Sequence, residues 1–210
     1  MVHRSVTIDW DNYEIYDPGV RGPLSALPRE EARAAFERLM AAKSTRIEAL
    51  RRLLEANNLE LSNTDAGLSD LNEWFRRNVE PDPEHPGRLL SDWYSVVNDV
   101  ALFLGEVIIQ RCPGARWEFF TGGKKDGAYQ RHVLMGFPRV ANPKFNIDID
   151  RSVATYAHRI VTAQGSAPTY GTTTVRGINI DVDAAAARSR TNPIESDVFY
   201  RWVKAAESKA

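Results

Sequence analysis

A chain of 210 residues with 43% hydrophobic and 26% charged residues has the composition of a folded globular protein. Its formal net charge of −1 at pH 7 disfavours non-specific nucleic-acid binding, because proteins of that class carry a marked positive excess. Cys112 is the only cysteine, which excludes a disulfide within the chain.

The first elements are a short strand and a long helix. Alternating apolar residues at positions 6, 8 and 10 predict the strand. Apolar residues then recur every three or four positions from 29 to 57, which predicts a helix that Pro28 precedes and Asn57 or Asn58 ends. Lys43 lies within the apolar stripe of this helix. We expect it to extend its ammonium group to the surface, and the alternative is a buried lysine with a carboxylate partner.

Two further helices complete the first half of the chain. Asp65 is a suitable N-cap for the first, and the proline-rich residues 81–87 form a connector. Residues 91–110 are apolar on nearly all sides, which predicts a buried central helix. Gly105 costs about 1 kcal/mol relative to alanine inside a helix, so an aromatic ring or a backbone should pack closely there. Glu106 needs a partner if it is buried, for which Arg116 or Arg131 is a candidate.

The second half of the chain is richer in strand patterns. Residues 117–120, 130–137, 145–149 and 175–182 are predicted strands, residues 122–127 a hairpin connection, and residues 166–174 a loop. A helix capped by Asp150 runs to Gly165, and a last helix begins near Glu195. The predicted fold is a single α+β domain, 1–210, with a helical half at about 25–112 and a strand-rich half at about 115–210. In it, the N-terminal helices and the buried central helix pack on a mostly antiparallel sheet of about four strands.

No segment is predicted to enter a membrane or to direct secretion. The most apolar run, residues 96–109, is interrupted by Asn98, Asp99 and Glu106, and it falls short of the ~18–20 apolar residues that span a bilayer. The N-terminus lacks the apolar segment of a secretory signal. We therefore expect a cytoplasmic protein.

The most regular acidic pattern is a near-repeat. Asn-Ile-Asp-Ile-Asp at 146–150 resembles Asn-Ile-Asp-Val-Asp at 179–183. On a strand, both aspartates of each copy would lie on one face, about 7 Å apart, and carboxylate oxygens are the ligands that Mg²⁺ and Ca²⁺ prefer. The simpler interpretation is that these aspartates face solvent. The candidate metal ligands are Asp148, Asp150, Asp181 and Asp183, as an alternative to a protein without a cofactor.

Other motifs do not define a catalytic site. Residues 121–127 lack the spacing of a phosphate-binding loop, no pair of histidines has metal-ligand spacing, and no serine lies in a Gly-x-Ser-x-Gly motif. Cys112 follows a helix, whereas a reactive thiol favours a helix N-terminus. The loop lysines could instead contact an acidic partner. The candidate binding residues are Lys124, Lys125, Arg131, His132 and Glu106. A nucleic-acid interface that adds Arg188 and Arg190 would require one continuous positive face.

One resemblance can be drawn from residues 102–108 and from Gly114, Arg116 and Trp117. An apolar helix with Leu-Gly-Glu that leads into a Trp-bearing strand resembles bacterial families of unknown function, some of them immunity-protein-like. The resemblance covers about residues 91–165 and carries over no catalytic residue. It implies a non-catalytic protein-binding module of immunity or regulatory type, with another protein as partner. The alternative is a metal-dependent enzyme or a ligand-binding protein that uses the strand aspartates.

Overall fold

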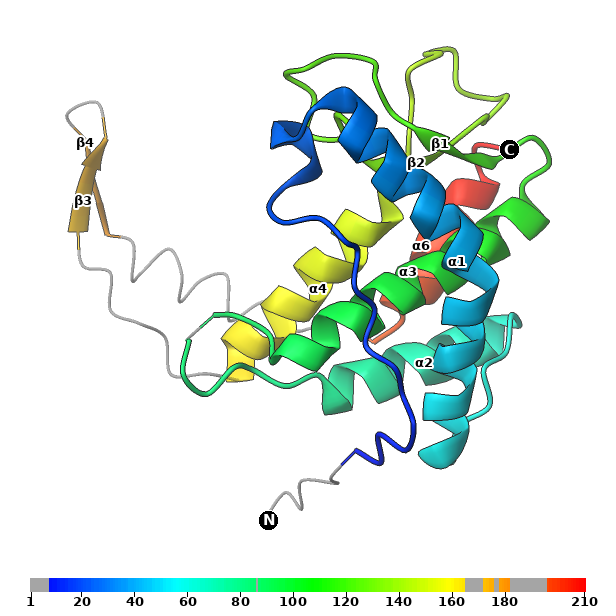
Figure 1. Ribbon diagram of the computed structural model, residues 1–210, viewed down its shortest axis with the longest axis vertical. Helices are drawn as coiled ribbons and strands as arrows, with labels where there is room; N and C mark the ends of the chain where they lie inside the picture. Colours follow the sequence, from blue (N-terminus) through cyan, green and yellow to red (C-terminus); the bar gives the residue numbers. More distant parts are fainter. Residues whose placement is uncertain (1–7, 86, 165–171, 176–177, 182–195) are drawn as a thin grey trace.

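The computed structural model describes residues 8–85, 87–164, 172–175, 178–181 and 196–210. Within these residues the chain forms five α-helices, one short 3-10 helix and two antiparallel strand pairs (Figure 1). In chain order the elements are η1 (Leu24–Ala26), α1 (Arg29–Ala56), α2 (Asp65–Asn78), α3 (Ser91–Arg111), β1 (Arg116–Phe119), β2 (His132–Met135), α4 (Ile149–Gln164), β3 (Thr172–Val175), β4 (Ile178–Asp181) and α6 (Val198–Glu207).

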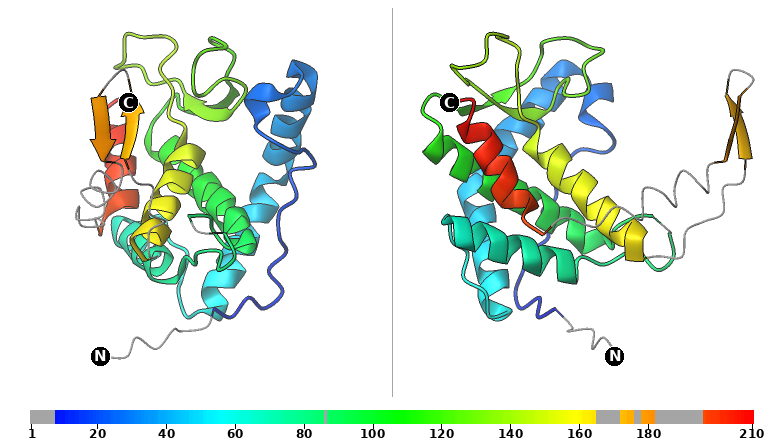
Figure 2. Two further views of the ribbon diagram at one scale, coloured as in Figure 1. Left: turned by 90° about the vertical axis from the view of Figure 1, so that its left-hand side faces the viewer. Right: turned by 180° about the vertical axis from the view of Figure 1, so that it is seen from behind.

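Helix α3 is the centre of the fold, as its sequence predicts. Buried residues occur on all of its sides, because α1, α4 and α6 each pack against it. Figure 2 shows α1 and α6 on opposite sides of α3, and α2 lies across the end of the bundle against α6. Much of the core therefore lies between helices. Within it, the Phe75 ring contacts the rings of Trp93, Tyr156 and Phe199.

The helix ends follow local capping chemistry. Asn58 has a φ of 60° just after α1, which is the left-handed conformation expected there. The Thr64 hydroxyl accepts the Gly67 N–H at 3.1 Å, so Thr64 caps α2 and Asp65 is the first helical residue rather than the cap. In α4 the cap is Asp148, whose Oδ1 accepts the Arg151 N–H at 3.0 Å. The prediction of Asp150 as cap was therefore two residues late.

The prediction of a four-stranded sheet is wrong. β1 pairs only with β2 in a regular ladder, with Trp117 opposite Leu134, and β3 pairs with β4 in a separate ladder. Ile147 adds a single bridge to Leu134, because the chain already enters α4 two residues later. Residues 172–174, predicted as loop, belong to β3. At the N-terminus, residues 8–10 are not a strand, and position 6 lies outside the described residues.

Apart from η1, the segment before α1 has no regular structure and runs across α1 and α3. It is held by a buried polar network that the sequence does not reveal. Arg46 of α1 donates to both carboxylate oxygens of Asp99 on α3, at 3.0 and 2.6 Å, and the Tyr13 hydroxyl donates to the same carboxylate at 2.6 Å. The Tyr16 N–H donates to Ser95 Oγ at 2.8 Å. These bonds fix the N-terminal segment to the two longest helices.

Candidate functional site

A groove of about 620 Å³ lies where α4 and α6 run side by side, on the side of α3 that faces away from α1 (Figure 2). The loop before β2 and the turn before α4 close one end. The lining residues run along α4 from the Asp148 cap to Arg159, which is about 16 Å of helix length at 1.5 Å per residue. The groove is therefore elongated along a helix.

Apolar and aromatic side chains form the floor of this groove, and arginines lie on one wall. The floor contains Ile147, Tyr156, Val198 and Trp202. The centre of the Trp202 ring lies 6.1 Å from that of Tyr156 and 5.7 Å from that of Phe199, so Trp202 packs against neighbouring rings. The wall is the exposed face of α4, with Arg151, Ser152, Thr155 and Arg159. Trp, Tyr and Arg are the residues that most often dominate binding energy in protein interfaces.

At the closed end, Arg131 binds the two aspartates of the first acidic pattern. Its guanidinium donates to both oxygens of Asp148 and, at 2.6 Å, to Asp150 Oδ2. Burial lowers the pKa of Arg131, but the two carboxylates raise it by more, so the net shift is upward. The side chains of Asp148 and Asp150 do come together, around a guanidinium, and Asp148 also caps α4.

His132 lies beside this cluster and is almost completely buried. Its Nε2 is 3.8 Å from Asp150 Oδ2, and its ring centre is 6.0 Å from that of Trp117. Burial lowers the pKa of His132 below its usual value, an effect larger than the opposing one of Asp150. The imidazole is thus neutral at pH 7, and it does not reach the groove.

Glu106 belongs to a different cluster, between α1 and β1. Its carboxylate receives the Lys43 ammonium at 2.6 Å and the Trp117 indole N–H at 2.8 Å. The expected partners, Arg116 and Arg131, do not bind it. Lys43 has the carboxylate partner of the alternative interpretation, but it is not buried, because both side chains keep partial solvent exposure. Gly105 packs directly under the Trp117 ring, as its position in the helix predicts.

The predicted metal ligands are only partly within the described residues. Asp181 ends β4 with its side chain not described, and Asp183 lies outside. Among the described residues, no group of three or more His, Cys, Asp or Glu side chains is arranged to hold a metal ion. Cys112 is buried at the C-terminal end of α3, and burial raises the pKa of its thiol.

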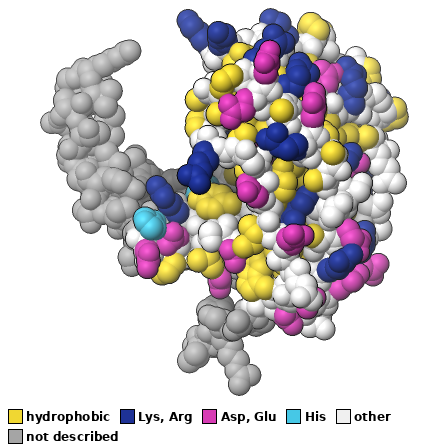
Figure 3. Space-filling view, in the orientation of Figure 1, with side chains coloured by type: hydrophobic (Ala, Val, Ile, Leu, Met, Phe, Trp, Pro, Cys, Tyr) yellow, Lys and Arg dark blue, Asp and Glu magenta, His cyan; other side chains and the backbone are white. Residues whose placement is uncertain are grey.

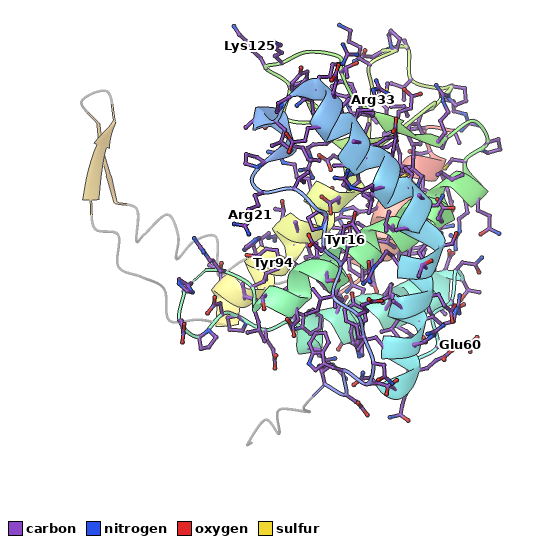
Figure 4. All side chains as sticks on the ribbon, viewed as in Figure 1. Tyr16, Arg21, Arg33, Glu60, Tyr94 and Lys125 are labelled. Atoms are coloured by element: carbon purple, nitrogen blue, oxygen red, sulfur yellow. The ribbon has the colours of Figure 1, made fainter. Side chains whose placement is uncertain are left out.

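Charge on the surface is mixed. Lys124 and Lys125 are exposed at the loop that closes the groove, and Lys125 lies at its outer end (Figure 4). Figure 3 shows basic and acidic side chains interspersed over the face it displays. Arg131 is engaged with its aspartates, and Arg188 and Arg190 lie outside the described residues. In the part of the chain that the structure describes, no helix has the length and apolarity to cross a bilayer.

The predicted binding residues therefore do not form one site. Lys124 and Lys125 adjoin the groove through Asp126. Arg131 and His132 lie behind its closed end, and Glu106 belongs to the cluster between α1 and β1. Sequence reasoning missed the α4 wall and the aromatic floor. The polar spacing at 148, 151, 155 and 159 marks one helical face, but nothing local indicates that α6 lies beside it.

Comparisons with known proteins add no relative, since no family model, curated protein or solved structure matches the chain.

Proposed function

We propose that the protein is a non-catalytic protein-binding module and that the α4–α6 groove is its binding site. The observation that carries the proposal is the composition of the groove: two aromatic side chains in the floor and two exposed arginines on the wall. Anchoring residues of these types in a concave site are typical of protein interfaces. The resemblance of about residues 91–165 to bacterial families of unknown function, some of them immunity-protein-like, supports a partner protein, and an immunity or regulatory role is part of the proposal.

The proposal is tested by obstructing the groove without touching the core. Thr155 is exposed and lines the wall, so Thr155→Trp fills the groove from the solvent side. Thr45 is an exposed threonine of α1 outside the groove, and Thr45→Trp is the matched control. Wild-type protein and both variants are used as bait in native lysate, and captured proteins are quantified by mass spectrometry.

We expect a stoichiometric partner that wild type and Thr45→Trp capture equally and that Thr155→Trp loses by at least tenfold. A partner retained by Thr155→Trp would place the interface elsewhere. Tyr94 is the obvious candidate in that case, because it is one of the two large hydrophobic residues most exposed among the described residues, and it lies near Tyr16 in Figure 4.

A further inference from the structure

Some charged side chains around the groove have ion-pair partners and others do not. Arg151 and Arg159 are exposed, and neither forms an ion pair with any described residue. The lining carboxylate of Asp148 is already bound twice by Arg131. On the neighbouring helix α2, Glu73 is paired with two arginines of its own helix. The α4 wall therefore presents two positive charges that the described part of the fold leaves uncompensated.

Asp126 is the exception at the closed end. It lines the groove, and its carboxylate accepts the Ala128 N–H at 2.9 Å without a cation among the described residues. Lys124 and Lys125 are exposed on the same loop, so Asp126 does not make the closed end negative, and negative charge on a ligand is favoured by the arginines of α4.

The spacing of the two arginines defines the ligand further. They are eight positions apart on the helix, which corresponds to about 12 Å along its axis. In an extended peptide, residues i and i+4 are about 13 Å apart, and residues i, i+2 and i+4 lie on the same face. Two carboxylates at i and i+4 can then meet the two guanidinium groups, while the side chain at i+2 faces the aromatic floor.

From this geometry we infer that the partner presents an extended acidic segment, Asp/Glu-x-Φ-x-Asp/Glu, where Φ is aromatic or aliphatic. The carboxylates pair with Arg151 and Arg159, and the apolar side chain packs on Trp202 and Tyr156. Guanidinium–carboxylate pairs combine charge with directional hydrogen bonds, which gives register as well as affinity. This inference rests on the proposed function and specifies the partner's chemistry.

The test uses three fluorescein-labelled peptides on full-length protein, with binding measured by fluorescence anisotropy at low salt. The acidic probe is Glu-Ser-Phe-Ser-Glu, the neutral one Gln-Ser-Phe-Ser-Gln and the basic one Lys-Ser-Phe-Ser-Lys. We expect the acidic peptide to bind at least tenfold more tightly than the neutral one. The double substitution Arg151→Glu with Arg159→Glu should reverse the order, so that the basic peptide binds best. Arg52→Glu, at an exposed arginine of α1, should leave the order unchanged.

Equal binding of the acidic and neutral peptides would overturn the inference, as would a charge reversal that does not invert the preference, or no acidic binding below 1 mM. If the protein self-associates and Thr155→Trp abolishes this self-association, the groove binds a second copy of the chain, and the inference is overturned as well. A partner whose capture depends on Thr155 but not on the two arginines would leave the proposed function standing and remove only the acidic segment.

Discussion

Replacing Gly105 by alanine sets helix propensity against packing. Propensity alone predicts that Gly105→Ala stabilises the protein by about 1 kcal/mol, because glycine is a poor helix former. The structure predicts the opposite. A Cβ at this position would lie 2.0 Å from Trp117 Cζ2 and 2.6 Å from Cη2, whereas carbon atoms pack at about 3.5–4.0 Å. The indole ring must therefore move by more than an ångström.

That movement has two costs. Overpacking in a filled site costs about 1–3 kcal/mol. The ring is also held by its N–H donation to Glu106, and a hydrogen bond to a charged group contributes about 1.5–3 kcal/mol when it is lost entirely. After the gain in propensity is subtracted, we expect Gly105→Ala to destabilise the fold by about 2 kcal/mol. For a chain of this size the melting temperature should fall by about 4–8 °C.

Equilibrium urea unfolding, followed by circular dichroism, measures the change. In a Trp117→Leu background the obstacle is gone, and the same glycine-to-alanine change should stabilise by up to about 1 kcal/mol. The resulting coupling energy of about 3 kcal/mol is at the upper end for residues in contact. A Gly105→Ala protein more stable than wild type, with no coupling to position 117, would refute the reasoning.

Three further predictions concern buried and partly buried titratable side chains. Arg46→Met should destabilise the fold by about 3–5 kcal/mol in thermal unfolding, because it leaves the Asp99 carboxylate buried without its cation, and the double change with Asp99→Leu should cost much less than the sum of the two. Burial lowers the pKa of His132, so as the pH falls the histidine is protonated in the unfolded chain before it is protonated in the folded protein. The free energy of unfolding should therefore decrease as the pH falls through about 6.5, and a His132→Gln variant whose stability depends on pH in the same way as wild type would contradict this. Because Arg131 lies between its two aspartates, calorimetric titration with Mg²⁺ or Ca²⁺ should give no saturable heat, and a signal abolished by Asp148→Asn would restore the metal alternative.

Sequence patterns predicted the features that a single element determines. Helix α3 is apolar on nearly all sides, a pattern that is typical of a buried helix. The low helix propensity of Gly105 likewise indicated a group packed closely against it. The identity of that neighbour, Trp117, and the pairing of Glu106 with Lys43 depend on where β1 and α1 lie against α3. No local pattern contains that information.

The sheet was overestimated for a related reason. Five alternating residues at 145–149 fit a strand, but they equally fit a short extended entry into a helix in which Ile147 bridges once and Asp148 caps. Period-two alternation over so few residues does not separate the two cases. The groove was missed because its floor joins Tyr156 of α4 to Trp202 of α6, and only the packing of both helices on α3 brings these rings together.

The polar network of the N-terminal segment also constrains how the chain is made. Tyr13 and the carboxylate that it binds are 86 residues apart in the sequence. At a synthesis rate of ~5–20 residues per second, the tyrosine leaves the ribosome about 4 to 17 s before Asp99 does. During that interval the N-terminal segment and α1 cannot complete their polar contacts, and the Arg46 guanidinium stays in water. The segment that is synthesised first therefore forms its polar contacts only after the central helix has been synthesised.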